Sequence, residues 1–251
     1  MRQWLAGILS GLSVALHSAS PFFHAYVGME WLKVRNLNYT DEQREAFLRG
    51  NIFPDIRYHA NLSRESTHRD NVTLKEVDSI RDPFLKGVAL HSYVDEERFR
   101  FIDQSQLGFD IDQFEGNTNL GLKMVEDEIV FLSDESTLWN TIIRGLRHYD
   151  QRECIPGLAY DKLVSWQEMM IEYFMQGPIY FFRRALSEDR LFITVPRKDM
   201  FESLEMMKSL KYQQSACEYV EKLRKHFKSN IHSFSRQIKL AEEKEGAPSK
   251  L

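Results

Sequence analysis

Two residue types that bind metals lie four positions apart in one predicted helix, at His91 and Asp95. Residues at this spacing share a helix face, so an imidazole and a carboxylate can reach one point in space. Phe84 and Val88 precede them on the same stripe, which predicts that the polar pair continues a buried apolar face. Buried ionisable groups are costly unless they pair or bind a cation. The pair therefore indicates either a metal site or a hydrogen-bonded pair in the core.

Further ligand types lie upstream of this helix. Asp55 directly follows Pro54, which fixes the chain direction and can aim the carboxylate inward. His68 lies in a polar loop beyond His59, and His24 lies on the apolar stripe of the first predicted helix. Each histidine alone has an ordinary alternative as a surface or core residue. Together they form a nitrogen and oxygen set that predicts one or two divalent ions, with zinc favoured over manganese or iron(II). The predicted ligands are His24, Asp55, His68, His91 and Asp95.

The ordered set of motifs resembles the zinc-dependent phospholipase C family, whose distant relatives include the single-strand-specific nucleases. The resemblance covers about the first half of the chain, from Ser20 to about Ile129. It rests on the run from Phe22 to Gly28, the run from Gly50 to Asp55, His68, and the spacing Gly87-x-x-x-His91-x-x-x-Asp95.

This resemblance implies specific roles for the five residues. Asp95 would bridge two metals, Asp55, His68 and His91 would complete one of them, and His24 would serve another. The implied activity is hydrolysis of a phosphate ester, plausibly a phospholipid head group, by a metal-activated water. Asp55 and Asp95 are then the catalytic carboxylates, with Asp55 as general base beside the metal.

The chain departs from the family pattern where that family holds a further zinc. Family members present a histidine shortly after the HxxxD segment and an HxxxE on a later helix. Here the first position falls among aromatics at Phe99 to Phe101, and Leu122 to Glu128 has carboxylates without histidine. The third site is therefore expected to be degraded, with Lys123 as a fixed cation in its place, or with ligands from His148 and Asp150. Two rival hypotheses are a metal-binding domain without catalysis and a helical protein-interaction domain with incidental histidines.

Length and composition predict a single all-α domain. The chain has 251 residues, of which 43% are hydrophobic and 28% charged, and no strand pattern stands out apart from a short piece at Leu191 to Val195. The net charge is -4, without a strongly basic run, so general nucleic-acid binding is not expected.

Cys154 and Cys217 lack the neighbours of a structural zinc site, and whether they form a disulfide is open. The sequence does not fix the oligomeric state.

Cap residues and apolar spacing predict a phospholipase C/nuclease-like helical bundle that ends in a long amphipathic helix. The domain is placed at residues 20–240, followed by a polar tail at 241–251. Capping boxes at Thr40 and Thr73 and the Asp82-Pro83 start mark three helices, and Gly50 is expected to end one of them. The other predicted helices begin near Ser20 and cover Asn119 to Leu132, Thr137 to His148, Tyr160 to Met175, Pro178 to Leu186 and about Tyr212 to Leu240.

Two regions of the sequence leave open whether the protein is exported and whether it contacts a membrane surface. Leu5 to Leu16, after Arg2, has the length of a signal-peptide core and is too short to cross a bilayer. Residues 1–19 are either a bacterial-type signal peptide, which implies a secreted or periplasmic protein, or a retained first helix of a cytoplasmic one. An aromatic cluster is predicted to be core, with an acyl groove or membrane-surface contact as the alternative. Its members are Tyr173, Phe174, Tyr180, Phe181 and Phe182.

Overall fold

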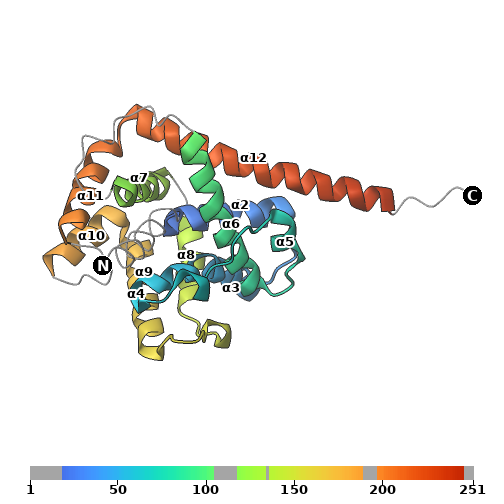
Figure 1. The fold of residues 1–251 in the computed structure, drawn as a ribbon, viewed down its shortest axis with the longest axis horizontal. Helices are drawn as coiled ribbons and strands as arrows, with labels where there is room; N and C mark the ends of the chain where they lie inside the picture. Colours follow the sequence, from blue (N-terminus) through green and yellow to red (C-terminus); the bar gives the residue numbers. More distant parts are fainter. Residues whose placement is uncertain (1–18, 105–117, 134–135, 189–196, 246–251) are drawn as a thin grey trace, which may run out of the picture.

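The computed structural model describes residues 19–104, 118–133, 136–188 and 197–245. Within these ranges the protein contains helices and no strand, which confirms the all-α fold class (Figure 1). The proposed extended piece at Leu191 to Val195 and most of the proposed signal segment lie outside the described residues. None of the described helices is long and apolar enough to cross a membrane. The elements are α2 (Pro21–Arg35), α3 (Asp41–Ile52), η1 (Phe53–Asp55), α4 (Ile56–Ala60), η2 (Arg64–Ser66), α5 (Leu74–Ser79), α6 (Pro83–Gln104), α7 (Thr118–Ser133), α8 (Ser136–Leu146), η3 (Gln151–Glu153), α9 (Tyr160–Gln176), α10 (Pro178–Ser187), α11 (Arg197–Leu210) and α12 (Gln214–Glu245).

Side-chain caps fix the starts of the helices around the site, as the sequence predicted. Thr40 and Gln43 form a reciprocal capping box at the start of α3, and Thr73 and Glu76 form another at α5. The Oδ1 atom of Asp82 accepts a hydrogen bond of 2.9 Å from the backbone N–H three residues later, in the first turn of α6. These bonds satisfy N–H groups that have no partner within the helix. They set where α3 and α6 begin.

Two glycines allow α3 and α6 to cross in direct backbone contact. A Cβ atom at Gly50 would lie 2.1 Å from the carbonyl oxygen of Phe84, and one at Gly87 would lie 2.1 Å from that of Phe47. Any side chain at either position would therefore force the helices apart. The prediction that Gly50 ends a helix is wrong, because α3 continues to Ile52 and the glycine serves the crossing instead. This close contact brings the end of α3 against the His91 face of α6.

An aromatic core packs around Phe22 of α2. The ring of Phe22 packs edge-on to Trp139, with centroids 4.7 Å apart, and lies 4.6 Å from Phe174 of α9. Of the predicted aromatic cluster, the core interpretation is confirmed for Tyr173, Phe174, Phe181 and Phe182, which are all buried. Tyr180 differs, being 57% exposed.

The C-terminal part of the chain differs from the prediction in two respects. α12 runs to Glu245, five residues beyond the predicted end at Leu240, and its last turns project past the other helices (Figure 1). α11 is absent from the predicted helices, although Met200, Leu204 and Met207 follow helical spacing and are buried. No Ser, Thr, Asp or Asn stands directly before it to mark its start.

Cys154 and Cys217 are both free thiols, so the two do not form a disulfide. The Sγ atom of Cys154 lies 2.6 Å from the hydroxyl oxygen of Tyr149, and that of Cys217 points to the backbone carbonyl of Lys211 at 3.5 Å.

Candidate metal centre

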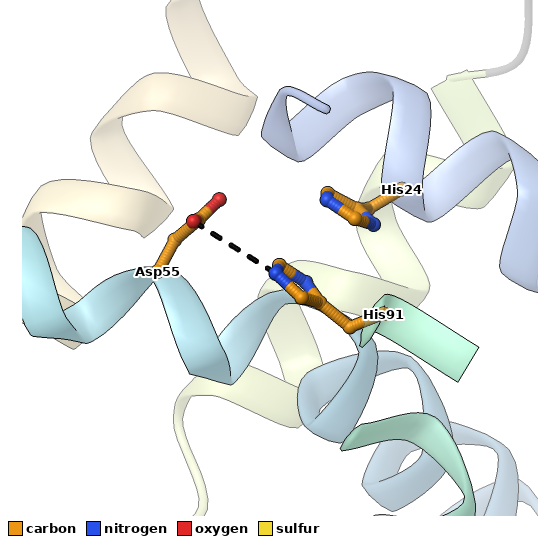
Figure 2. Close-up of side chains that lie close together, drawn as sticks. All are labelled: His24, Asp55 and His91. Atoms are coloured by element: carbon orange, nitrogen blue, oxygen red, sulfur yellow. Dashed lines mark ion pairs between the residues drawn. The ribbon is translucent and has the colours of Figure 1, made fainter. Parts of the chain in front are cut away.

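The five predicted ligands converge where α2, η1 and α6 meet. His24 comes from α2, Asp55 from η1, His68 from the loop after η2, and His91 and Asp95 from α6. Four of these residues are buried, and the side chain of Asp55 remains 13% exposed. Figure 2 shows the side chains of His24, Asp55 and His91 pointing toward one another. The imidazoles of His24 and His91 stack, with centroids 3.7 Å apart and planes 9° from parallel.

The carboxylate of Asp95 faces different histidines with its two oxygens. Oδ1 lies 3.2 Å from Nε2 of His24, and Oδ2 lies 3.2 Å from Nε2 of His68. Nε2 of His91 lies 3.6 Å from Oδ2 of Asp95 and 3.8 Å from Oδ1 of Asp55. Two groups of three donors each fall within 4.8 Å and could hold a metal ion: His24 with Asp55 and His91, and His68 with His91 and Asp95.

The tautomer of His91 is fixed by the backbone of α3. Its Nδ1 lies 2.9 Å from the carbonyl oxygen of Asn51, which can only accept, so Nδ1 carries the proton. In the neutral ring, Nε2 then presents a lone pair toward the oxygens of Asp55 and Asp95. Burial, followed by the nearby His24, lowers the pKa of His91 well below its usual range, which favours this neutral form. Nε2 of His68 lies 3.1 Å from Nε2 of His91, nearer than either carboxylate, so either a proton on His68 or a cation at the same point can satisfy this lone pair.

Several buried atoms at the same point have no hydrogen-bond partner among the described residues. They are Nδ1 and Nε2 of His24 and Oδ1 of Asp55. The Nε2 atom of His24 lies 3.2 Å from Asp95 but outside hydrogen-bonding geometry. Buried polar groups are nearly always satisfied, so a cluster of unsatisfied nitrogen and oxygen atoms points to a ligand. The donor types are those that bind divalent transition metals.

Neighbouring groups orient the other ligands. Oγ1 of Thr67 pairs with Nδ1 of His68 at 2.8 Å, which leaves Nε2 of that ring facing the centre. The backbone N–H of Ala19 donates to Oδ1 of Asp95 at 2.7 Å, and Arg64 donates to Oδ2 at 3.2 Å. Such outer contacts fix ring orientation and carboxylate rotamer before any ion binds.

The two carboxylates of the centre have opposite pKa shifts. Burial raises the pKa of Asp55 above its ordinary value, although the nearby His24 opposes this effect. Burial acts in the same direction on Asp95, but the imidazoles of His91, His24 and His68 outweigh it and hold its pKa well below the usual range. Asp95 is therefore the permanently ionised carboxylate, whereas Asp55 is the one more able to take up a proton.

Positive charge surrounds the carboxylates on two sides. Arg64 contacts Asp95 directly, and its side chain is 16% exposed at the edge of the centre. Lys123 of α7 is half-buried, and burial together with the charge of Arg98 lowers its pKa to about 8, against the opposing effect of Asp55 and Asp95. The prediction that Lys123 is a fixed cation in the place of a third metal stays a prediction.

The carboxylates of α7 are engaged in contacts with other side chains and backbone groups. Glu126 accepts two hydrogen bonds of 2.8 Å from Arg98 and one of 2.7 Å from the hydroxyl of Tyr219, all of them buried. Asp127 accepts from Ser20, Tyr173 and the backbone N–H of Phe23. Glu128 accepts from the backbone N–H of Ile179 and from Lys211. No histidine or cysteine of the described chain joins them in a metal-binding group.

The other histidines near these motifs lie outside the centre. Nε2 of His59 contacts the hydroxyl of Ser165 at 2.6 Å. His148 is 69% exposed, 3.8 Å from Glu45, and Asp150 pairs with Arg49 and Arg152. The hypothesis that His148 and Asp150 replace the missing ligands is therefore not supported by their positions.

Sequence reasoning did not identify Arg64, Thr67 or Asn51 as part of the site. Arg64 could have been found, because it lies one helical turn before His68, and the backbone N–H of His68 donates to its carbonyl at 2.8 Å. Asn51 contributes a backbone carbonyl, which no side-chain pattern reveals. Comparisons of the chain with protein-family models, curated proteins and solved structures find no match.

Proposed function

We propose that the protein is a metal-dependent hydrolase of phosphate esters, with zinc held by His24, Asp55, His68, His91 and Asp95. The observation that carries the proposal is the group of His24, Asp55 and His91, whose donor atoms lie within 4.8 Å of one another and which leaves both ring nitrogens of His24 and Oδ1 of Asp55 buried without a described hydrogen-bond partner. Three imidazoles and two carboxylates suit zinc better than magnesium or calcium, which prefer oxygen ligands.

The geometry favours one tight ion and a second, weaker one. Both possible groups of three use Nε2 of His91, and one lone pair binds one ion. His68, His91 and Oδ2 of Asp95 form the more compact group, with the two ring nitrogens 3.1 Å apart. A second ion would depend on His24 and Asp55, with fewer protein ligands. Since affinity depends on ligand number, we propose that this second position fills at higher zinc concentration.

When bound, zinc lowers the pKa of a coordinated water to about 7 and stabilises negative charge on phosphate oxygens. In this proposal Asp55 accepts the proton of that water, and the support is that its Oδ1 has no described hydrogen-bond partner and that its pKa is raised. Arg64 would contact a phosphate oxygen of the substrate, and the support is its partial exposure beside Asp95. Asp95 stays ionised and holds His24 and His68 in position.

A phosphodiester is the proposed substrate class, and the phospholipid head group is its more specific form. The surrounding cations support an anionic substrate, whereas the choice of phospholipid rests on the resemblance of the motifs. Hydrolysis of bis-nitrophenyl phosphate, phosphatidylcholine and phosphatidylinositol, each with and without added zinc, tests both levels.

We expect zinc-dependent turnover that Asp95→Asn abolishes and Asp55→Asn lowers by about 100-fold, as typical for loss of a general base. His59→Ala serves as the matched control, because it removes a nearby histidine that contacts Ser165 instead of the centre. Equal turnover in the Asp95→Asn variant would refute the proposal. Turnover of the soluble diester alone would retain the hydrolase and reject the lipid substrate.

A second candidate function is a metal-binding domain without catalysis. The observation in its favour is that the carboxylate of Glu126 is engaged by the buried Arg98 and is therefore not free to bind a further metal, whose charge would help a transition state. Stoichiometric zinc binding without turnover of any of the three substrates would support this alternative over the hydrolase.

A further inference from the structure

A stripe of basic residues runs along the solvent-facing side of α12. Lys225, Lys228, His232, Arg236 and Lys239 follow one another at steps of three or four residues, and all five are exposed. This spacing places them on one helix face, over a length of about 21 Å at 1.5 Å per residue. No Asp or Glu occurs between Glu221 and Glu242. We call these five residues the α12 stripe.

The stripe borders a groove between α12 and the end of α2. The groove has a volume of about 500 Å³ and is lined by Lys33, Val34 and Glu30 from α2 and by Lys228, His232, Arg236 and Lys239, among others, from α12. Glu30 is its one carboxylate, and it is already shared between Lys33 at 3.2 Å and Lys228 at 3.9 Å. The groove therefore keeps an excess of positive charge.

Apart from the contact of Lys228 with Glu30, the charge of the stripe is not paired with acids in the described chain. No ion pair links Lys225, Arg236 or Lys239 to a carboxylate of the described residues. At the N-terminal end of the stripe, Glu221 is engaged by Arg224 at 2.9 Å. A run of like charges along one face lowers stability through repulsion, so an anion on this face would relieve it.

We propose that the α12 stripe binds the phosphate groups of an anionic phospholipid surface. The last turns of α12 project beyond the other helices (Figure 1). The five residues share one exposed face of this helix, so they can meet a flat anionic surface together. Leu240, next to the last lysine, is 57% exposed and can enter the head-group layer. A long nucleic acid is the less favoured partner, because the exposed apolar side chain of Leu240 beside the last lysine suits a lipid head-group layer and finds no apolar counterpart along a phosphate backbone.

The α12 stripe does not form a continuous basic run in the sequence, because its basic residues are separated by apolar and neutral residues. Only the helical period brings them together. The inference is independent of the metal centre, since none of its residues lies among the proposed ligands.

Sedimentation of the full chain with vesicles tests the proposal. Vesicles of phosphatidylcholine alone are compared, at low and high salt, with vesicles that also contain about 30% of the anionic lipid phosphatidylglycerol. We expect binding to the anionic vesicles only, with loss of binding as salt screens the charges. The double variant Lys228→Gln/Lys239→Gln should lower the partition coefficient about 25-fold, since each cation near such a surface contributes about fivefold.

The control variant Lys75→Gln/Lys162→Gln removes two exposed lysines from α5 and α9 and should bind like the wild type. Thermal melts establish that both variants fold, and zinc-dependent hydrolysis of a soluble diester should be unchanged in both. Equal loss of binding in the two variants, or no binding to anionic vesicles, would overturn the proposal. So would tighter binding to duplex DNA than to vesicles, or binding abolished by inorganic phosphate at millimolar concentration, which would indicate a site for a free anion.

Discussion

Replacing Gly87 with alanine tests whether the α3–α6 crossing builds the metal centre. The added Cβ would lie 2.1 Å from the carbonyl oxygen of Phe47 and 2.7 Å from the backbone nitrogen of Asn51, whereas ordinary contact begins at 3.4 Å. The two helices must therefore separate by about 1 Å or more. That movement pulls the carbonyl of Asn51 away from Nδ1 of His91, a hydrogen bond of 2.9 Å.

The magnitude follows from two opposing effects. A Gly→Ala change at an open helical position would stabilise the protein by about 1 kcal/mol. Overpacking costs about 1–3 kcal/mol, and a contact of 2.1 Å with backbone puts this case at the upper end, so we expect net destabilisation of about 2 kcal/mol in the presence of a chelator. Loss of the carbonyl that orients His91 should weaken zinc binding by about 10- to 100-fold.

Urea unfolding with chelator measures the stability change, and competition with a chromophoric chelator measures the zinc affinity. Leu85→Ala is the control, because Leu85 lies on the same helix but is 38% exposed. The reasoning is refuted if the Gly87→Ala variant is as stable as the wild type and binds zinc equally well. A loss of stability with unchanged zinc affinity would show that the crossing of α3 and α6 does not determine the geometry of the metal centre.

Three further predictions concern groups around the centre. Thr67→Val should weaken zinc binding by about 10-fold or more with little loss of stability, measured by zinc titration, because it removes the partner of Nδ1 of His68. Arg98→Leu should cost about 3–5 kcal/mol in urea unfolding, because it leaves the charge of Glu126 buried without its guanidinium partner and with the hydroxyl of Tyr219 as its remaining described donor, whereas adding Glu126→Leu should recover most of that loss. Burial raises the pKa of Asp127 to about 7, so the folded protein keeps a proton that the unfolded chain releases near pH 4. Wild-type stability relative to Asp127→Asn should therefore fall as the pH rises from about 4 to 7 and stay level above it, which urea unfolding at pH 5, 6 and 8 can follow.

The parts of the fold that were predictable are those set by local chemistry. The capping boxes at Thr40 and Thr73 and the Asp82 cap depend on residues three positions apart, so the sequence contains the whole interaction. The spacing of His91 and Asp95 within one helix was likewise sufficient to place both side chains on a common face.

The parts that were not predictable depend on contacts between distant segments. The role of Gly50 is decided by the backbone of Phe84, and α12 continues past Leu240 without a signal that distinguishes it from a polar tail. The Arg98–Glu126 ion pair joins α6 to α7. Because the two residues are 28 positions apart in the sequence, neither of them indicates that they bind one another. The convergence of His24, His68 and Asp55 rested on the motif order, since their spacing alone does not place them together.

The most direct test of the central claim is the metal content of the protein purified without chelator, measured by atomic emission together with the shift in melting temperature on adding zinc. We expect at least about one zinc ion per chain and a clear rise in melting temperature, since binding to the folded state alone stabilises it. Asp95→Asn should lose both effects, and His59→Ala should keep both. A folded wild-type protein that holds no metal and whose melting temperature does not respond to zinc would contradict the account.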